Sequence, residues 1–102
     1  MQLHHLLSWF QTTRQWRELS TGSQDVYSIL IKQGVDLLGP SHYMSDVDAI
    51  KADDLYLTLK KTKGQHKATA ICVVLRRVWN VAIRYRKTFF NPFSAMGLKT
   101  TD

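Results

Sequence analysis

The chain has 102 residues, a net charge of +6 and a mass of 11.8 kDa, a size that suits a single domain with one modest core. Hydrophobic residues make up 44% of it and charged residues 22%, which excludes wholesale disorder, and its single cysteine excludes a disulfide scaffold. The longest apolar run, 70–75, is too short to span a membrane and no secretion leader opens the chain, so we expect a soluble, cytoplasmic protein.

Apolar residues recur at helical spacing along almost the whole chain, and we therefore predict an all-α fold. The first predicted helix covers residues 3–18, where Leu3, Leu6, Leu7 and Phe10 form an apolar stripe. No internal repeat and no low-complexity segment interrupts this pattern.

The second predicted helix has Thr21 as its expected N-cap and continues until Gly39. Thr21 and Gln24 have the spacing of a capping box, and Gly39 followed by Pro40 is a typical helix stop. The residues of its predicted buried stripe are Val26, Tyr27, Leu30, Ile31, Gly34, Val35 and Leu38.

The third predicted helix is capped by Asp48 and has Ile50, Leu55 and Leu59 on its apolar side. The fourth, over residues 65–86, has the strongest periodic signal in the chain. The residues of its apolar face are Ala68, Ile71, Val74, Leu75, Val78, Ala82 and Tyr85.

The segment after the fourth helix is expected to pack on the helices and then to leave them. Pro92 disfavours a helical conformation at the residue before it. We expect Phe89, Phe90 and Phe93 to fold back over an open end of the bundle, and residues 99–102 to belong to a polar linker.

No group of residues in the sequence carries catalytic chemistry. The four histidines lack the spacing of metal ligands, and Cys72 lies in an apolar run that fits a core thiol. Asp53 and Asp54 suit the positive start of a helix, and neither a phosphate-binding glycine loop nor a nucleophile elbow occurs. We therefore expect no metal, no cofactor, no small-molecule substrate and no enzymatic activity in this chain.

Positive charge is concentrated in the second half of the chain. Residues 1–50 carry three Lys or Arg against five Asp or Glu, residues 51–102 carry eleven against three, and no acidic residue occurs between Lys60 and Lys99. Because solvated surfaces usually mix both signs, this asymmetry favours a polyanion partner. Nucleic acid comes ahead of an acidic membrane surface because no lipidation signal is present. A merely solvated basic face is the alternative.

The polar side of the fourth predicted helix is the candidate site. Its arginine and asparagine side chains have the geometry that reads guanine and adenine edges, and lysines at its start suit phosphate groups. The stripe consists of Thr69, Arg76, Asn80, Arg84 and Lys87, with Arg77 beside it. The residues at the start of the helix are Lys63, Gln65, His66 and Lys67. Exposed helix faces are commonly charged without any partner, which is the alternative here too.

The fourth predicted helix and the segment after it carry a specific sequence pattern. The pattern consists of Ala68-Thr69-Ala70-Ile71, then Leu75-Arg76-Arg77-Val78-Trp79-Asn80-Val81-Ala82-Ile83-Arg84-Tyr85, then Asn91-Pro92-Phe93. In this pattern, above all in Trp-Asn-x-Ala and Asn-Pro-Phe, the chain resembles the phage-type tyrosine recombinases, or integrases, in their N-terminal core-binding domain. The upstream helices match in order and spacing, so the resemblance covers nearly the whole chain.

The resemblance implies a four-helix, SAM-like core-binding domain over residues 1–90 and, over 91–102, the start of a linker to a catalytic domain outside this chain. It implies duplex DNA at a core recombination site and other recombinase protomers as partners, in a bacterial host. Strand cleavage would belong to the catalytic domain, so no tyrosine here is implied as the nucleophile. Carried over by position, the implied DNA-binding residues are Ser20, Thr21, Ser23, Gln24, Lys63, His66, Lys67, Thr69, Arg76, Arg77, Asn80 and Arg84.

One position departs from the family's pattern. Arg86 stands where the family usually has a glycine, so either Arg86 adopts a strained turn or the fourth helix runs on past it. The alternative function for the whole chain is a free-standing basic helical regulator or adaptor that binds RNA, an acidic protein or a membrane surface.

Overall fold

The computed structural model of the chain describes residues 1–98. Within these residues every regular element is a helix, which confirms the all-α prediction for this part of the chain. The predicted polar linker at 99–102 lies outside the described residues. The elements are the 3₁₀ helix η1 (Leu3–His5), α1 (Leu6–Phe10), α2 (Arg14–Arg17), α3 (Thr21–Leu38), the 3₁₀ helix η2 (Met44–Asp46), α4 (Ala49–Lys63) and α5 (Gln65–Arg84).

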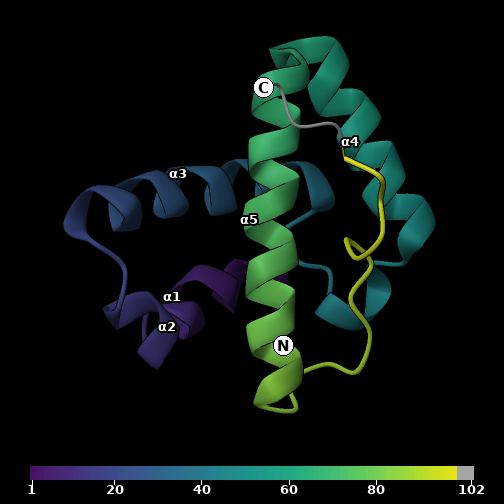
Figure 1. Cartoon of the computed structure of the whole chain (residues 1–102). Helices are drawn as coiled ribbons and strands as arrows, with labels where there is room; N and C mark the ends of the chain where they lie inside the picture. Colours follow the sequence, from purple (N-terminus) through teal and green to yellow (C-terminus); the bar gives the residue numbers. More distant parts are fainter. Residues whose placement is uncertain (99–102) are drawn as a thin grey trace.

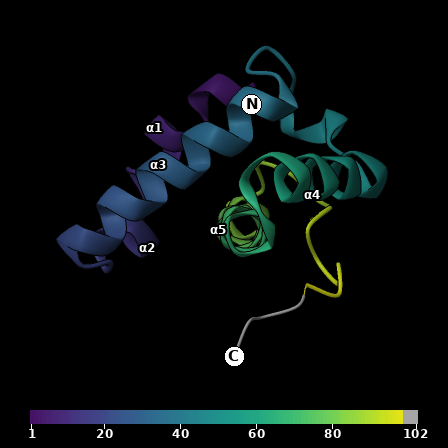
Figure 2. The same ribbon diagram turned by 90° about the horizontal axis from the view of Figure 1, so that it is seen from above.

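Helix α5 is the centre of the fold (Figure 1). Seen end-on in Figure 2, α5 has α3 and α4 on one side of it, and no helix formed by residues 1–98 covers the opposite side. Gly34 allows α3 to approach closely, because a Cβ atom at this position would lie 2.8 Å from Cδ1 of Leu75. The predicted apolar face of α5 is confirmed except at Tyr85, which is exposed; its buried members are Ala68, Ile71, Val74, Leu75, Val78 and Ala82.

The predicted continuous helix over residues 3–18 is wrong, because the chain turns between α1 and α2. The hydroxyl of Thr13 donates to the carbonyl of Phe10 (2.7 Å) and accepts from the N–H of Trp16 (3.3 Å), so it caps α2. Threonine hydroxyls compete in this way with helical backbone hydrogen bonds. The turn brings the rings of Phe10 and Trp16 into edge-to-face contact at 6.0 Å.

The predicted N-cap residue is confirmed for α4 and wrong by one position for α3. Asp48 caps α4 as predicted, its carboxylate accepting from the N–H of Lys51 at 2.8 Å. Helix α3 starts one residue earlier than predicted, because the hydroxyl of Ser20, rather than Thr21, accepts from the N–H of Ser23.

On each of α3 and α4, one residue predicted to be buried is exposed. Val26 on α3 is 53% exposed and Ile50 on α4 is 71% exposed, so both predictions are wrong. On α4 the fully buried position near its start is Ala52 instead. The next residue, Tyr27, is half-buried and bonds to Arg77 of α5, so Val26 lies on the outer side of the same turn of α3.

Helix α5 ends in a Schellman motif with an arginine in the left-handed position. Arg86 has a φ of 60°, its N–H donates to the carbonyl of Ile83 (3.0 Å), and the N–H of Lys87 donates to that of Ala82 (2.8 Å). A left-handed residue other than glycine costs about 1 kcal/mol. Of the two expectations for this position, the strained turn is therefore correct and the longer helix is not.

The segment after α5 folds back onto this helix. The side-chain amide of Asn91 donates to the carbonyl of Arg76 (2.9 Å) and to Oδ1 of Asn80 (2.8 Å), and its own Oδ1 accepts from the N–H of Phe93 (3.0 Å). The ring of Phe93 is fully buried edge-to-face against Trp79, with ring centroids 5.1 Å apart. We call these contacts of Asn91 and Phe93 with α5 the tail lock.

The predicted burial of three phenylalanines is confirmed only for Phe93. Phe89 is 89% exposed and Phe90 is 58% exposed, so for these two residues the prediction is wrong. The tail lock explains the difference, because it fixes the chain from Asn91 onward and leaves the turn before it on the surface.

The tail lock predicts a measurable loss of stability in Asn91→Ala. We expect the free energy of unfolding to fall by about 1–2 kcal/mol, because the change removes three hydrogen bonds, one of them to the buried N–H of Phe93. Asn80→Ala removes only one of these bonds and serves as the control. Urea unfolding of both variants measures the difference, and an equal loss in the two would contradict this account of Asn91.

Candidate nucleic-acid interface

The side of α5 that no helix of residues 1–98 covers carries six of the twelve predicted DNA-binding residues. Helical spacing places these six on one face of α5, opposite its packed side (Figure 2), with Arg77 at the edge next to α3. We call this the free face of α5, and its residues are His66, Thr69, Val73, Arg76, Arg77, Asn80 and Arg84. Arg77, Asn80 and Arg84 are exposed, whereas Arg76 is half-buried at the edge of the face.

The segment that contains the free face has no acidic side chain to neutralise its positive charge. No acidic residue occurs between Lys60 and Lys99, and two ion pairs of the structure, Arg14 with Glu18 and His42 with Asp46, lie outside α5. The guanidinium of Arg77 donates to the hydroxyl of Tyr27 on α3 at 2.5 Å. This bond fixes the side chain while its other N–H groups remain as donors, which is a geometry suited to an anion.

Asn80 has a structural contact that the sequence did not reveal. Its Oδ1 accepts from Asn91 in the tail lock, so one acceptor position is already used. The second lone pair and the two N–H groups of its amide are left for other partners. Asn80 therefore both stabilises the fold and presents donors on the free face.

Of the four residues predicted at the start of α5, the three implied as DNA-binding residues do not all lie on the free face. Lys63 is the last residue of α4, and Gly64, with a φ of 90°, separates it from α5. His66 lies on the free face and is exposed. Lys67 is half-buried. Val74 and Val78, seven and eleven residues after it, share its side of the helix, so Lys67 lies toward the packed side of α5.

The predicted residues at the start of α3 form a separate group. The hydroxyl of Ser20 caps the helix and also donates to that of Ser23 (3.0 Å), and the amide of Gln24 donates to the carbonyl of Trp16 (3.0 Å). Thr21 is exposed. Figure 1 shows this end of α3 at the left, away from α5, so the structure does not join the two groups into one patch.

A hollow beside the end of α5 contains cations that the sequence analysis left out. Its volume is about 450 Å³, and we call it the corner hollow because it lies where the chain turns from α1 to α2. The sequence analysis missed Arg14 and Arg17 because it summed charge over residues 1–50, which are acidic overall. Sums over shorter windows would have found them. The residues that line it are Trp9, Thr12, Thr13, Arg14, Arg17, Tyr85 and Lys87.

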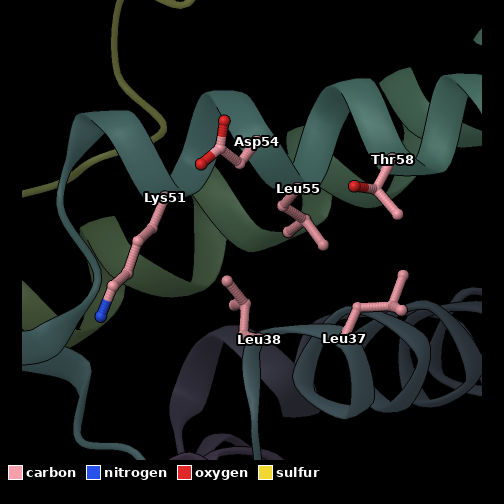
Figure 3. Close-up of a pocket in the computed structure, with 6 residues that line it drawn as sticks. All are labelled: Leu37, Leu38, Lys51, Asp54, Leu55 and Thr58. Atoms are coloured by element: carbon pink, nitrogen blue, oxygen red, sulfur yellow. The ribbon is translucent and has the colours of Figure 1, made fainter.

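A second hollow lies between α3 and α4 (Figure 3). Leu37, Leu38 and Leu55 form its apolar part, and Thr58 also lines it. Its two charged side chains, Lys51 and Asp54, point in different directions.

The single cysteine of the chain, Cys72, is buried on α5. Burial, together with the charge of Asp53, raises the pKa of the Cys72 thiol to about 12, so this thiol stays protonated at neutral pH. Within residues 1–98 no three His, Cys, Asp or Glu side chains are grouped as metal ligands. None of the helices in that range is long and apolar enough to cross a membrane. Comparison of the chain with models of protein families, with curated proteins and with solved structures gave no match.

Proposed function

We propose that this chain is the DNA-binding, core-binding domain of a phage-type tyrosine recombinase and that the free face of α5 contacts duplex DNA. The observation that carries the proposal is the uncovered face of α5, which presents Arg76, Arg77, Asn80 and Arg84 and no carboxylate. An α-helix fits the major groove of B-form DNA, where guanidinium and amide groups discriminate base pairs. The deep, narrow major groove of RNA does not admit side chains in this way.

Sequence and contacts together support the assignment to this family. The two specific parts of the resemblance, Trp79-Asn80-x-Ala82 and Asn91-Pro92-Phe93, touch each other in the tail lock. They therefore share one physical role, which is to hold the segment after α5 against this helix. In the proposed four-helix, SAM-like arrangement, residues 1–90 clamp one side of the core site in the company of other recombinase protomers.

The chemistry of recombination belongs to a catalytic domain outside this chain. The domain described here binds and positions DNA. Two of its tyrosines, Tyr27 and Tyr85, contact side chains on other helices. Tyr27 accepts a hydrogen bond from Arg77, and Tyr85 packs edge-to-face against Trp9 with ring centroids 6.4 Å apart.

The proposal predicts duplex binding that is weak and strongly salt-dependent. If the domain neutralises about 4–6 phosphates, the slope of log K against log salt concentration should be about −4 to −5. Fluorescence anisotropy with a labelled duplex at several salt concentrations measures this slope. An affinity that does not change between low and moderate salt would contradict the proposal.

A further inference from the structure

The corner hollow differs in charge from other hollows of the described surface, residues 1–98. Three cations line it, Arg14, Arg17 and Lys87, and no carboxylate does. Glu18, outside this lining, forms an ion pair with Arg14 at 2.8 Å, so Arg17 and Lys87 supply most of the positive charge of the hollow. Each of four other hollows has a carboxylate in its lining. The carboxylate is Asp54 in one hollow, Glu18 in another, and Asp36 in the remaining two.

Hydrogen bonds position the two guanidinium groups of the corner hollow and the backbone of its lysine. The guanidinium of Arg17 donates to the carbonyl of Thr12 at 2.9 Å, and that of Arg14 donates to Glu18 at 2.8 Å. The backbone of Lys87 is fixed by its hydrogen bond to Ala82 in the Schellman motif. Groups that are already positioned lose less entropy when they bind an anion.

The position of the hollow connects it to the free face. Tyr85, which forms part of its wall, directly follows Arg84, the last residue of the free face. Each strand of B-form DNA presents a phosphate about every 3.4 Å along the helix axis. A strand bound beside Arg84 therefore has further phosphates close to the hollow.

We propose that the corner hollow binds a phosphate group of the DNA backbone, with Lys87 and Arg17 as its principal ligands and Arg14 beside them. This inference rests on the proposed function, and it extends the DNA contact from α5 to the turn between α1 and α2. The hollow fixes the position of the duplex along α5 and adds no base discrimination, because phosphate contacts carry no sequence information directly.

Lys87→Gln tests the proposal, with Lys32→Gln as a control that removes the same charge from a hollow containing Asp36. Losing one phosphate contact should reduce the magnitude of the salt slope by about 0.9, so the loss of affinity between about 50 and 200 mM salt becomes about 3.5-fold smaller. The control should retain the wild-type slope. Circular dichroism checks that both variants are folded, and Arg84→Ala reports independently on the free face.

The outcomes separate this inference from the proposed function. If the wild type binds duplex DNA and Arg84→Ala weakens binding, but Lys87→Gln and Lys32→Gln have equal slopes, the phosphate site is wrong and the proposed function stands. If the wild type does not bind duplex DNA at low salt, both are wrong. A reduced slope in Lys87→Gln alone supports the site.

Discussion

Trp79→Ala is expected to lower the free energy of unfolding by about 3–5 kcal/mol, the usual range for deleting a buried tryptophan side chain. Trp79 is fully buried on α5, and its indole packs edge-to-face against Phe93. Removing the indole leaves a cavity between α5 and the ring of Phe93, and the tail lock loses its aromatic contact. Because domains of this size are stable by only about 5–15 kcal/mol, the variant should lose a large share of its stability.

Trp79→Phe is the matched variant for this prediction. The buried Nε1 of Trp79 has no hydrogen-bond partner in the described part of the chain, and an unsatisfied buried donor costs about 1–3 kcal/mol. Phenylalanine removes this donor and leaves a smaller cavity than alanine, so we expect a much smaller loss. Urea unfolding followed by circular dichroism compares the two variants. An equal loss in both would contradict the role assigned to the ring packing.

The parts of the fold that the sequence predicted correctly depend on local rules. The apolar face of α5 follows from helical period alone, and the cap at Asp48 follows from a side chain that bonds three residues ahead. The break after α1 was missed because two threonines bond backward to the backbone, which an apolar stripe does not reveal. The exposure of Val26 and Ile50 was missed because period identifies a face and not the neighbour that covers it.

The candidate site was predictable to a similar extent. The free face of α5 follows from residue spacing and from the absence of acidic residues, both of which are visible in the sequence. The bond between Asn80 and Asn91 was not predictable, because it depends on how the chain folds back after a helix end. Lys67 was grouped with the free face by its place in the sequence, but its helical position sets it toward Val74 and Val78.

Arg84→Ala is expected to reduce the discrimination between a preferred duplex and a scrambled one by about 1–3 kcal/mol, or about 5- to 150-fold. Arg84 is exposed at the end of the free face, where its planar guanidinium can make two hydrogen bonds to a guanine edge. Lys63→Ala, in contrast, should weaken binding to both duplexes alike, because an ammonium group supplies charge without base discrimination. Lys32→Ala, on α3, is the control and should change neither affinity.

The most direct test of DNA binding by the free face of α5 is one titration series at a fixed salt concentration. Wild type, Arg84→Ala, Lys63→Ala and Lys32→Ala are each titrated with a duplex selected from a random library by the wild type and with its scrambled counterpart. We predict that Arg84→Ala alone loses most of the ratio between the two affinities. If Arg84→Ala, folded by circular dichroism, retains both wild-type affinities and their ratio, the free face of α5 is not the DNA-binding surface.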